Sequence, residues 1–86
     1  MRILIHPGWQ DSGPEHWQSL WQNALPDCER VIQADWDRPQ LDEWVASLHR
    51  HIVAAPTPVL LVCHSLGCLT LAHWASRHRW TGAAAC

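Results

Sequence analysis

The sequence contains no phenylalanine, no tyrosine and no lysine, although 48% of its residues are hydrophobic. Its aromatic content consists of seven tryptophans, so indole rings must fill the large core positions together with Leu, Val and Ile. The basic side chains are six scattered arginines against eight acids, and the net charge is −2. Because phosphate binding needs a basic patch, this balance argues against a nucleic-acid partner.

Long apolar runs are absent as well. No segment approaches the roughly 20 apolar residues that a membrane-spanning helix needs, so we expect no membrane partner. The N-terminus enters the short apolar run 3–5 directly, without the pattern of a signal peptide. We therefore expect a cytoplasmic protein whose four cysteines stay reduced.

Metal-binding spacings are also missing. No C-x2-C or H-x3-H pair of the zinc-finger type occurs among the cysteines and histidines. Cys63, Cys68, His73 and His78 recur every five residues. On a helix this period places successive side chains about 140° apart, so they cannot converge on one ion. We expect no metal and no cofactor.

What is present alternates between short apolar runs, typical of buried parallel strands, and stripes with helical spacing. This alternation predicts an α/β fold in three layers, a parallel sheet flanked by helices, formed by a single domain over 1–86. We expect strands at 3–5, 30–33 and 59–62 and a fourth that starts at 83, with helices that start near 14, 37–39 and 66. Because the chain stops within the fourth strand, we expect a truncated fold whose uncovered sheet edge favours self-association.

Two of the predicted helices carry apolar stripes that we expect to be buried. In the first, the stripe is Trp17, Leu20, Trp21 and Ala24; in the second, it is Leu41, Trp44, Val45, Leu48 and Ile52.

The third strand leads directly into Cys63-His64-Ser65-Leu66-Gly67. This is close to the pattern G-x-S-x-G, in which a strained turn from strand to helix exposes a nucleophilic serine. Small residues flank the serine in that pattern because the backbones of the strand and the helix come very close. Gly67 meets this need, and the small Cys63 replaces the first glycine. The competing interpretation is that Ser65 only caps the following helix.

Three segments carry a resemblance to a known family: 6–18 (HPGWQDSGPEHWQ), 33–39 (QADWDRP) and 64–67 (HSLG). With them the chain resembles the RBBP9/YdeN-type small serine hydrolases, which are single-domain α/β-hydrolases without a lid. The resemblance runs from the first strand to the helix after Ser65. It implies a cytosolic enzyme about twice this long, with the acid and the histidine of its catalytic triad in the second half.

The expected site lies at the carboxyl ends of the strands, where the order of a parallel sheet reverses. Ser65 is the expected nucleophile, and the backbone amide of Leu66 is the first expected oxyanion donor. The second donor comes from the loop after the first strand, where Gly8 and Trp9 are the candidates and we expect Trp9. We expect Gly8, Trp36, His6 and His64 to be able to line the substrate, a small-molecule acyl compound. Trp9 and Trp36 could equally be anchors of packed loops. For His6 and His16, a role in loop structure or in hydrogen bonding to the backbone is the favoured alternative to substrate contact. His64 is expected to point away from Ser65, toward packing beneath the turn.

The sequence offers no plausible general base for Ser65. The last acidic side chain is Glu43, whereas the usual triad order places an acid after the serine. His73 and His78 follow Ser65 on or beyond the next helix, which leads away from it. Asp35 and Asp37 could be read as the triad acid, although we expect them to cap the second helix and to fix the Trp36 loop.

The sequence thus favours a serine hydrolase that acts on an ester-like or other acyl substrate through an acyl-enzyme. This chain alone is expected to lack the triad acid and base. Two alternatives stay open: a non-catalytic binding protein on a hydrolase scaffold, and an inactive truncated product.

Overall fold

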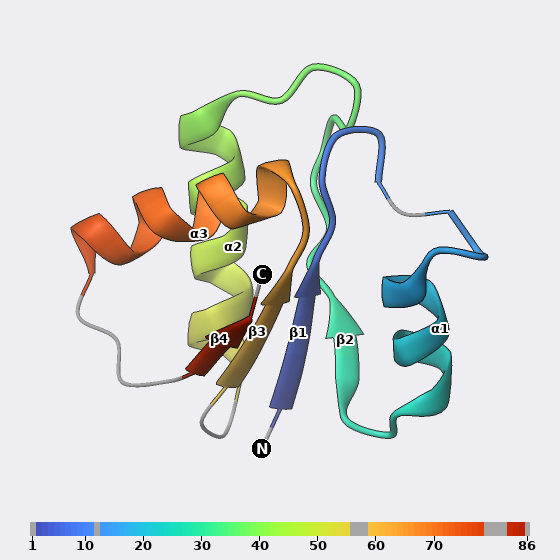
Figure 1. Ribbon diagram of the computed structural model, residues 1–86. Helices are drawn as coiled ribbons and strands as arrows, with labels where there is room; N and C mark the ends of the chain where they lie inside the picture. Colours follow the sequence, from blue (N-terminus) through green and yellow to red (C-terminus); the bar gives the residue numbers. More distant parts are fainter. Residues whose placement is uncertain (1, 12, 56–58, 79–82, 86) are drawn as a thin grey trace.

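The computed structural model describes residues 2–11, 13–55, 59–78 and 83–85. Four parallel strands form one sheet in the order β2-β1-β3-β4, with three helices around it (Figure 1). In chain order the elements are β1 (Arg2–His6), α1 (Trp17–Ala24), β2 (Cys28–Arg30), α2 (Leu41–Ala54), β3 (Val59–Cys63), α3 (Leu66–Arg77) and β4 (Ala83–Ala85). The predicted α/β fold with a parallel sheet is confirmed.

The strand order fixes which face each helix covers. The first crossover leads from β1 to β2 in one direction, and the next two lead from β2 to β3 and on to β4 in the other. Because such crossovers are right-handed, α1 covers one face of the sheet while α2 and α3 cover the other. Figure 1 shows this arrangement, and α2 and α3 contact each other. The reversal of direction falls between β1 and β3, where the predicted site lies.

The core lies between the sheet and the pair α2 and α3. Leu4 of β1 and Leu61 of β3 are fully buried there against Val45, Leu48 and Trp74 from the two helices. Burial of such side chains contributes about 1.5–3 kcal/mol each relative to exposure. Along β3, Val62 and Cys63 are buried too. The prediction that this strand is central and buried on both faces is confirmed.

The apolar stripe predicted for α1 is wrong. Trp17, Leu20 and Trp21 are 38%, 56% and 47% exposed, whereas the face toward the sheet holds Gln18 and Ser19. These two polar residues can be buried because their side chains make hydrogen bonds there. The Gln18 amide donates to strand carbonyls, and the Ser19 hydroxyl accepts from the Arg30 guanidinium at 2.6 Å.

Several predicted boundaries also shift. The second strand is Cys28–Arg30 and not 30–33, although the Val31 amide still donates to the Ile5 carbonyl at 2.8 Å beyond it. The first helix starts at Trp17 because 13–16 form a turn, closed by the bond from the His16 amide to the Gly13 carbonyl. The second starts at Leu41. The fourth strand is present as Ala83–Ala85, and Cys86 lies outside the described residues.

The outer strands of the sheet are β2 and β4. Together with the exposed indoles of α1 they leave apolar surface and strand edges uncovered in this chain, so the expected self-association stays a prediction. Among the described residues no helix is long and apolar enough to cross a membrane. Cys28, Cys63 and Cys68 form no disulfide with one another.

Candidate active site

Ser65 stands at the tip of a sharp turn between β3 and α3. The strand ends at Cys63 and the helix begins at Leu66, so the strand–turn–helix context predicted around the serine is present. Ser65 itself has φ 53° and ψ −119°. A non-glycine residue rarely adopts a positive φ, and holding it there costs on the order of 1–3 kcal/mol. The fold tolerates this strain at an exposed serine.

The side chain of Ser65 makes no capping hydrogen bond to α3. The first turn is closed by backbone groups instead, since the amides of Gly67 and Cys68 donate to the carbonyls of His64 and Ser65. The interpretation of Ser65 as a helix cap is therefore not supported. Ser65 is an exposed residue just past the carboxyl end of β3.

Gly67 lets the first turn of α3 lie directly on the end of β1. A Cβ atom at this position would stand 2.7 Å from the carbonyl oxygen of Pro7 and 2.8 Å from Nδ1 of His6, and closer still to the His6 carbonyl oxygen. Two of these three atoms are backbone and cannot rotate away. Only glycine fits here, as the sequence pattern around Ser65 requires.

Gly8 brings the loop after β1 against the same turn. A Cβ atom at Gly8 would lie 3.0 Å from Cβ of Ser65 and 3.3 Å from the amide nitrogen of Leu66. The Leu66 amide is the first of α3 and makes no hydrogen bond within the described part of the chain. The Leu66 amide is thus a candidate donor to an anion or a polar oxygen at the N-terminus of α3.

Trp9 follows on this loop, and its indole is 58% exposed. The indole N–H donates to the Asp37 carbonyl at 3.0 Å, and the amide of Gln10 donates to the Trp36 carbonyl at 3.0 Å. The loops after β1 and β2 are therefore joined. The Trp36 ring packs at 5.5 Å from the Trp44 ring, edge to face, which favours the anchor interpretation for this tryptophan.

His6 is fully buried at the end of β1, so it does not line an open site, and the alternative of hydrogen bonding to the backbone is favoured. Its Nδ1 lies 2.7 Å from the Pro7 carbonyl, and its Nε2 lies 3.0 Å from the amide nitrogen of Gln33. Burial lowers the pKa of His6 from its ordinary value of 6.5, against a smaller raising effect of the bond to Pro7. The imidazole is neutral at pH 7.

His64 is exposed, so the expectation that it packs beneath the turn is wrong as well. Its ring lies 4.7 Å from the His16 ring and 6.1 Å from the Trp17 ring, each approached edge to face. His16 is also the N-cap of α1, where its Nδ1 accepts from the Gln18 amide. The rings of His16, Trp17 and His64 thus form an aromatic cluster beside the turn that carries Ser65. His64 remains a candidate substrate-lining residue.

No described histidine is hydrogen-bonded to the Ser65 hydroxyl. His73 is exposed on α3, and the His78 ring stacks on those of His49 and Trp74 at the far end of that helix. Neither reaches the serine, as the sequence predicts. Among the residues that the structure describes there is also no group of three His, Cys, Asp or Glu side chains that could hold a metal ion.

Asp35 fixes the loop after β2 and does not cap α2. Its Oδ1 accepts from the amides of Asp37 and Arg38 at 3.0 and 3.1 Å. The N-cap of α2 is Gln40, without a side-chain hydrogen bond. The role expected in the Trp36 loop is confirmed for Asp35, and the capping role is wrong.

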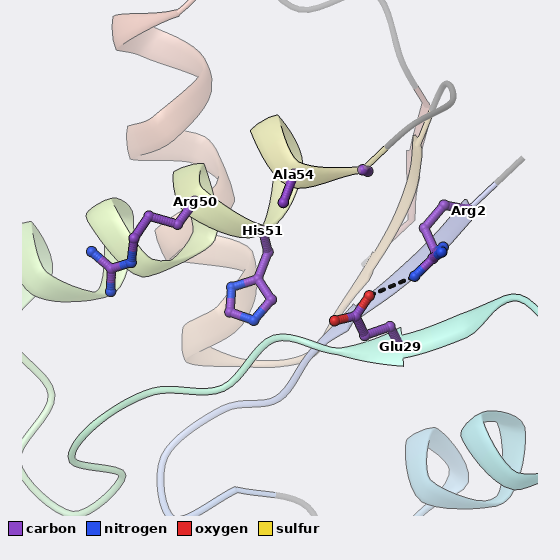
Figure 2. A pocket seen from close by; sticks show the side chains of 6 residues that line it. Arg2, Glu29, Arg50, His51 and Ala54 are labelled. Carbon is purple, nitrogen blue, oxygen red and sulfur yellow. Dashed lines mark hydrogen bonds and ion pairs between the residues drawn. The ribbon is translucent and has the colours of Figure 1, made fainter.

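A hollow of about 330 Å³ lies elsewhere, at the amino end of the strands (Figure 2). Arg2, Glu29 and His51 line it, and the Arg2 guanidinium pairs with the Glu29 carboxylate at 2.6 Å. Ser65 follows the carboxyl end of β3, at the opposite edge of the sheet. The hollow is therefore not part of the arrangement around Ser65.

Comparison with known proteins agrees with this geometry. A family model described as serine hydrolase matches residues 3–85. A crystal structure described as a YdeN-like hydrolase from Pectobacterium atrosepticum is 35% identical, with a TM-score of 0.85 over 91% of this chain. The chain spans 42% of the length of that hydrolase. None of the curated proteins compared with the chain matches it.

Proposed function

We propose, because this chain belongs to the serine hydrolase family, that Ser65 is the nucleophile of an acyl-transfer reaction. The substrate is a small molecule with an ester-like or other acyl group. No cofactor takes part. The observation that carries the proposal is the exposed Ser65 with φ 53°, which is held between β3 and α3 and does not cap the helix.

In the proposed reaction the Ser65 oxygen forms a bond to the carbonyl carbon while its proton passes to a histidine base. The carbonyl electron pair moves onto oxygen, which the amides of Leu66 and Trp9 stabilise. Collapse of this intermediate breaks the bond to the leaving group, which takes up the proton, and leaves an acyl-enzyme that water hydrolyses. Loss of one such oxyanion donor costs about 3–4 kcal/mol of transition-state stabilisation.

Two features support the oxyanion assignment. The Leu66 amide lies at the N-terminus of α3, where the helix dipole favours negative charge. The loop that carries Gly8 and Trp9 lies against Ser65, since even a methyl group at Gly8 would crowd the Ser65 Cβ. A second donor from this loop would therefore be within reach of the same oxygen.

The base and its acid are proposed to come from the part of the hydrolase fold that this chain does not cover. The chain spans 42% of the YdeN-like hydrolase, and no described histidine is bonded to Ser65. We accordingly treat 1–86 as one portion of a single domain. Without that base, Ser65 in 1–86 is expected to react more slowly than in the complete hydrolase fold.

The test is covalent labelling of the chain with a fluorophosphonate. We expect labelling that is lost in Ser65→Ala and kept in Ser76→Ala, a control on an exposed serine of α3 whose hydroxyl donates to the His73 carbonyl. Equal labelling of Ser65→Ala and the unmodified chain would contradict the proposal.

A specific observation favours one rival, a non-catalytic binding protein on the same scaffold: Ser65 has no bonded base among the described histidines. Under this rival a longer chain that covers the rest of the hydrolase fold remains unlabelled as well. Labelling of that longer chain, followed together with thermal unfolding, therefore separates the two.

A further inference from the structure

Two buried glutamine side chains meet beneath the proposed site. Gln18 of α1 and Gln33 after β2 are 0% and 4% exposed. A buried amide that lacked partners would cost several kcal/mol, so its hydrogen bonds show what holds it in place. Both amides reach the last residue of β1, His6, from different sides.

Gln33 determines which nitrogen of His6 carries the proton. The Gln33 amide nitrogen lies 3.1 Å from the Trp44 carbonyl oxygen, which can only accept, so this atom is the donating NH2 group. Its second hydrogen points to Nε2 of His6 at 3.0 Å. Nε2 must therefore accept, and in the neutral ring the proton sits on Nδ1.

The proton on Nδ1 in turn holds the loop after β1. Nδ1 lies 2.7 Å from the Pro7 carbonyl, to which it donates. Pro7 immediately precedes Gly8, which lies against Ser65 and Leu66. The opposite tautomer would set two lone pairs, on Nδ1 and on the carbonyl oxygen, against each other. The orientation of the Pro7–Gly8 peptide thus depends on Gln33.

Gln18 links the carboxyl ends of β1 and β3. Its amide donates to the carbonyls of His6 and Val62, at 3.3 and 3.2 Å, at the ends of the two central strands. The His6 carbonyl also accepts from the His64 amide at 3.1 Å. Strand β1, the turn at Ser65 and the loop at Gly8 are therefore all attached to His6.

We infer that Gln33 is a positioning residue: by fixing the His6 tautomer that holds the Pro7 carbonyl, it aims the loop amide at Trp9 toward the oxyanion beside Ser65. The inference rests on the proposed function of Ser65. Gln33 touches no reacting atom and acts through His6 alone. The buried, neutral state of His6 agrees with this role.

The test replaces Gln33 by methionine, which is similar in length and has no hydrogen-bond donor. We expect the two-bond ¹⁵N–¹H spectrum of His6 to change from the Nδ1–H tautomer to a mixture or to the Nε2–H form. The amide signals of Gly8 and Trp9 should shift with it, and labelling at Ser65 should fall about tenfold. Gln33→Asn, which keeps an amide but shortens the side chain, serves if Gln33→Met does not fold.

Ser47→Ala is the matched control. The Ser47 hydroxyl is buried and donates to the Ile32 carbonyl at 2.6 Å, so its loss also removes a bond between α2 and the segment after β2, without touching His6. This variant should lose stability and keep the His6 tautomer, the Gly8 and Trp9 signals and the labelling rate relative to the folded fraction.

The outcomes separate the two claims. An unchanged His6 tautomer in Gln33→Met, or Gly8 and Trp9 signals that do not move, overturns the inference. So does a loss of labelling that Ser47→Ala shares. If the unmodified chain never labels while Gln33→Met still moves the tautomer and the loop, the positioning role holds and the proposed function of Ser65 fails.

Discussion

Replacing Gly67 by alanine is expected to destabilise the chain by about 3 kcal/mol, the upper range for overpacking of a close contact. Helix propensity alone predicts the opposite sign, because alanine inside a helix is favoured over glycine by about 1 kcal/mol. Sterics win here: the added methyl group would overlap the His6 carbonyl oxygen and lie 2.7 Å from that of Pro7. For a chain of this size, with a stability of about 0.05–0.15 kcal/mol per residue, the loss is a large fraction of the total.

The measurement is urea or thermal unfolding followed by tryptophan fluorescence. Gly13→Ala is the control, because nothing lies within 4 Å of a Cβ atom built there and its φ is not positive. Gly13→Ala should leave the unfolding midpoint nearly unchanged. A Gly67→Ala chain as stable as the original would mean that α3 does not rest on the end of β1 as described.

The second large effect is expected at Gly8, on reactivity and not on folding. In Gly8→Ala the methyl group would stand 3.3 Å from the Leu66 amide nitrogen, and we expect it to crowd the oxyanion that is proposed to bind there. Contacts at 3.0–3.3 Å can relax by small shifts, so the fold should survive. Removal of one oxyanion donor lowers rates by about 10²–10³-fold, and we expect labelling of Ser65 to fall by about 100-fold.

Labelling kinetics and unfolding are measured on the same samples for this variant, again beside Gly13→Ala. An unfolding midpoint close to that of the unmodified chain with labelling about 100-fold slower supports the oxyanion assignment. Labelling of Gly8→Ala at the original rate would place the oxyanion elsewhere.

Much of the fold could be predicted because the sequence patterns of strands and helices are local, each within a few neighbouring residues. A parallel sheet with a sharp turn follows from the short apolar runs at β1 and β3 and from the glycine two residues after Ser65. The order of the strands then determines which face of the sheet each helix covers. The Ser65 turn was visible for the same reason, since small flanking residues are a local requirement of close backbones.

The interpretation of α1 failed because its buried face is chosen by hydrogen bonds and not by hydrophobicity. Helical spacing put the indoles of Trp17 and Trp21 inside, whereas the sheet face needs Gln18 to satisfy carbonyls at the strand ends. A glutamine between tryptophans gives no local sign of this. Its partners, His6 and Val62, lie 12 and 44 residues away in the sequence.

The same limit applies to His6, which is buried although the sequence predicts a loop position facing the site, and to His64, which is exposed although the sequence predicts that it packs beneath the turn. His6 follows a strand and precedes Pro7 and Gly8, which reads as a loop, yet the ladder of β1 extends to it and pairs it with Cys63 of β3. His64 lies in the turn that includes the positive φ of Ser65, and it is exposed. Only the tertiary register decides between a buried and an exposed ring in each case.

The most direct test of the central claim is to find where a fluorophosphonate attaches, by mass spectrometry of peptides from the folded, labelled chain. The account predicts an adduct on Ser65 that forms much faster than one on the exposed Ser76, because Ser65, unlike Ser76, combines a strained turn with the nearby Leu66 amide. A folded chain in which both serines react equally slowly, or in which no adduct appears on Ser65, would contradict it.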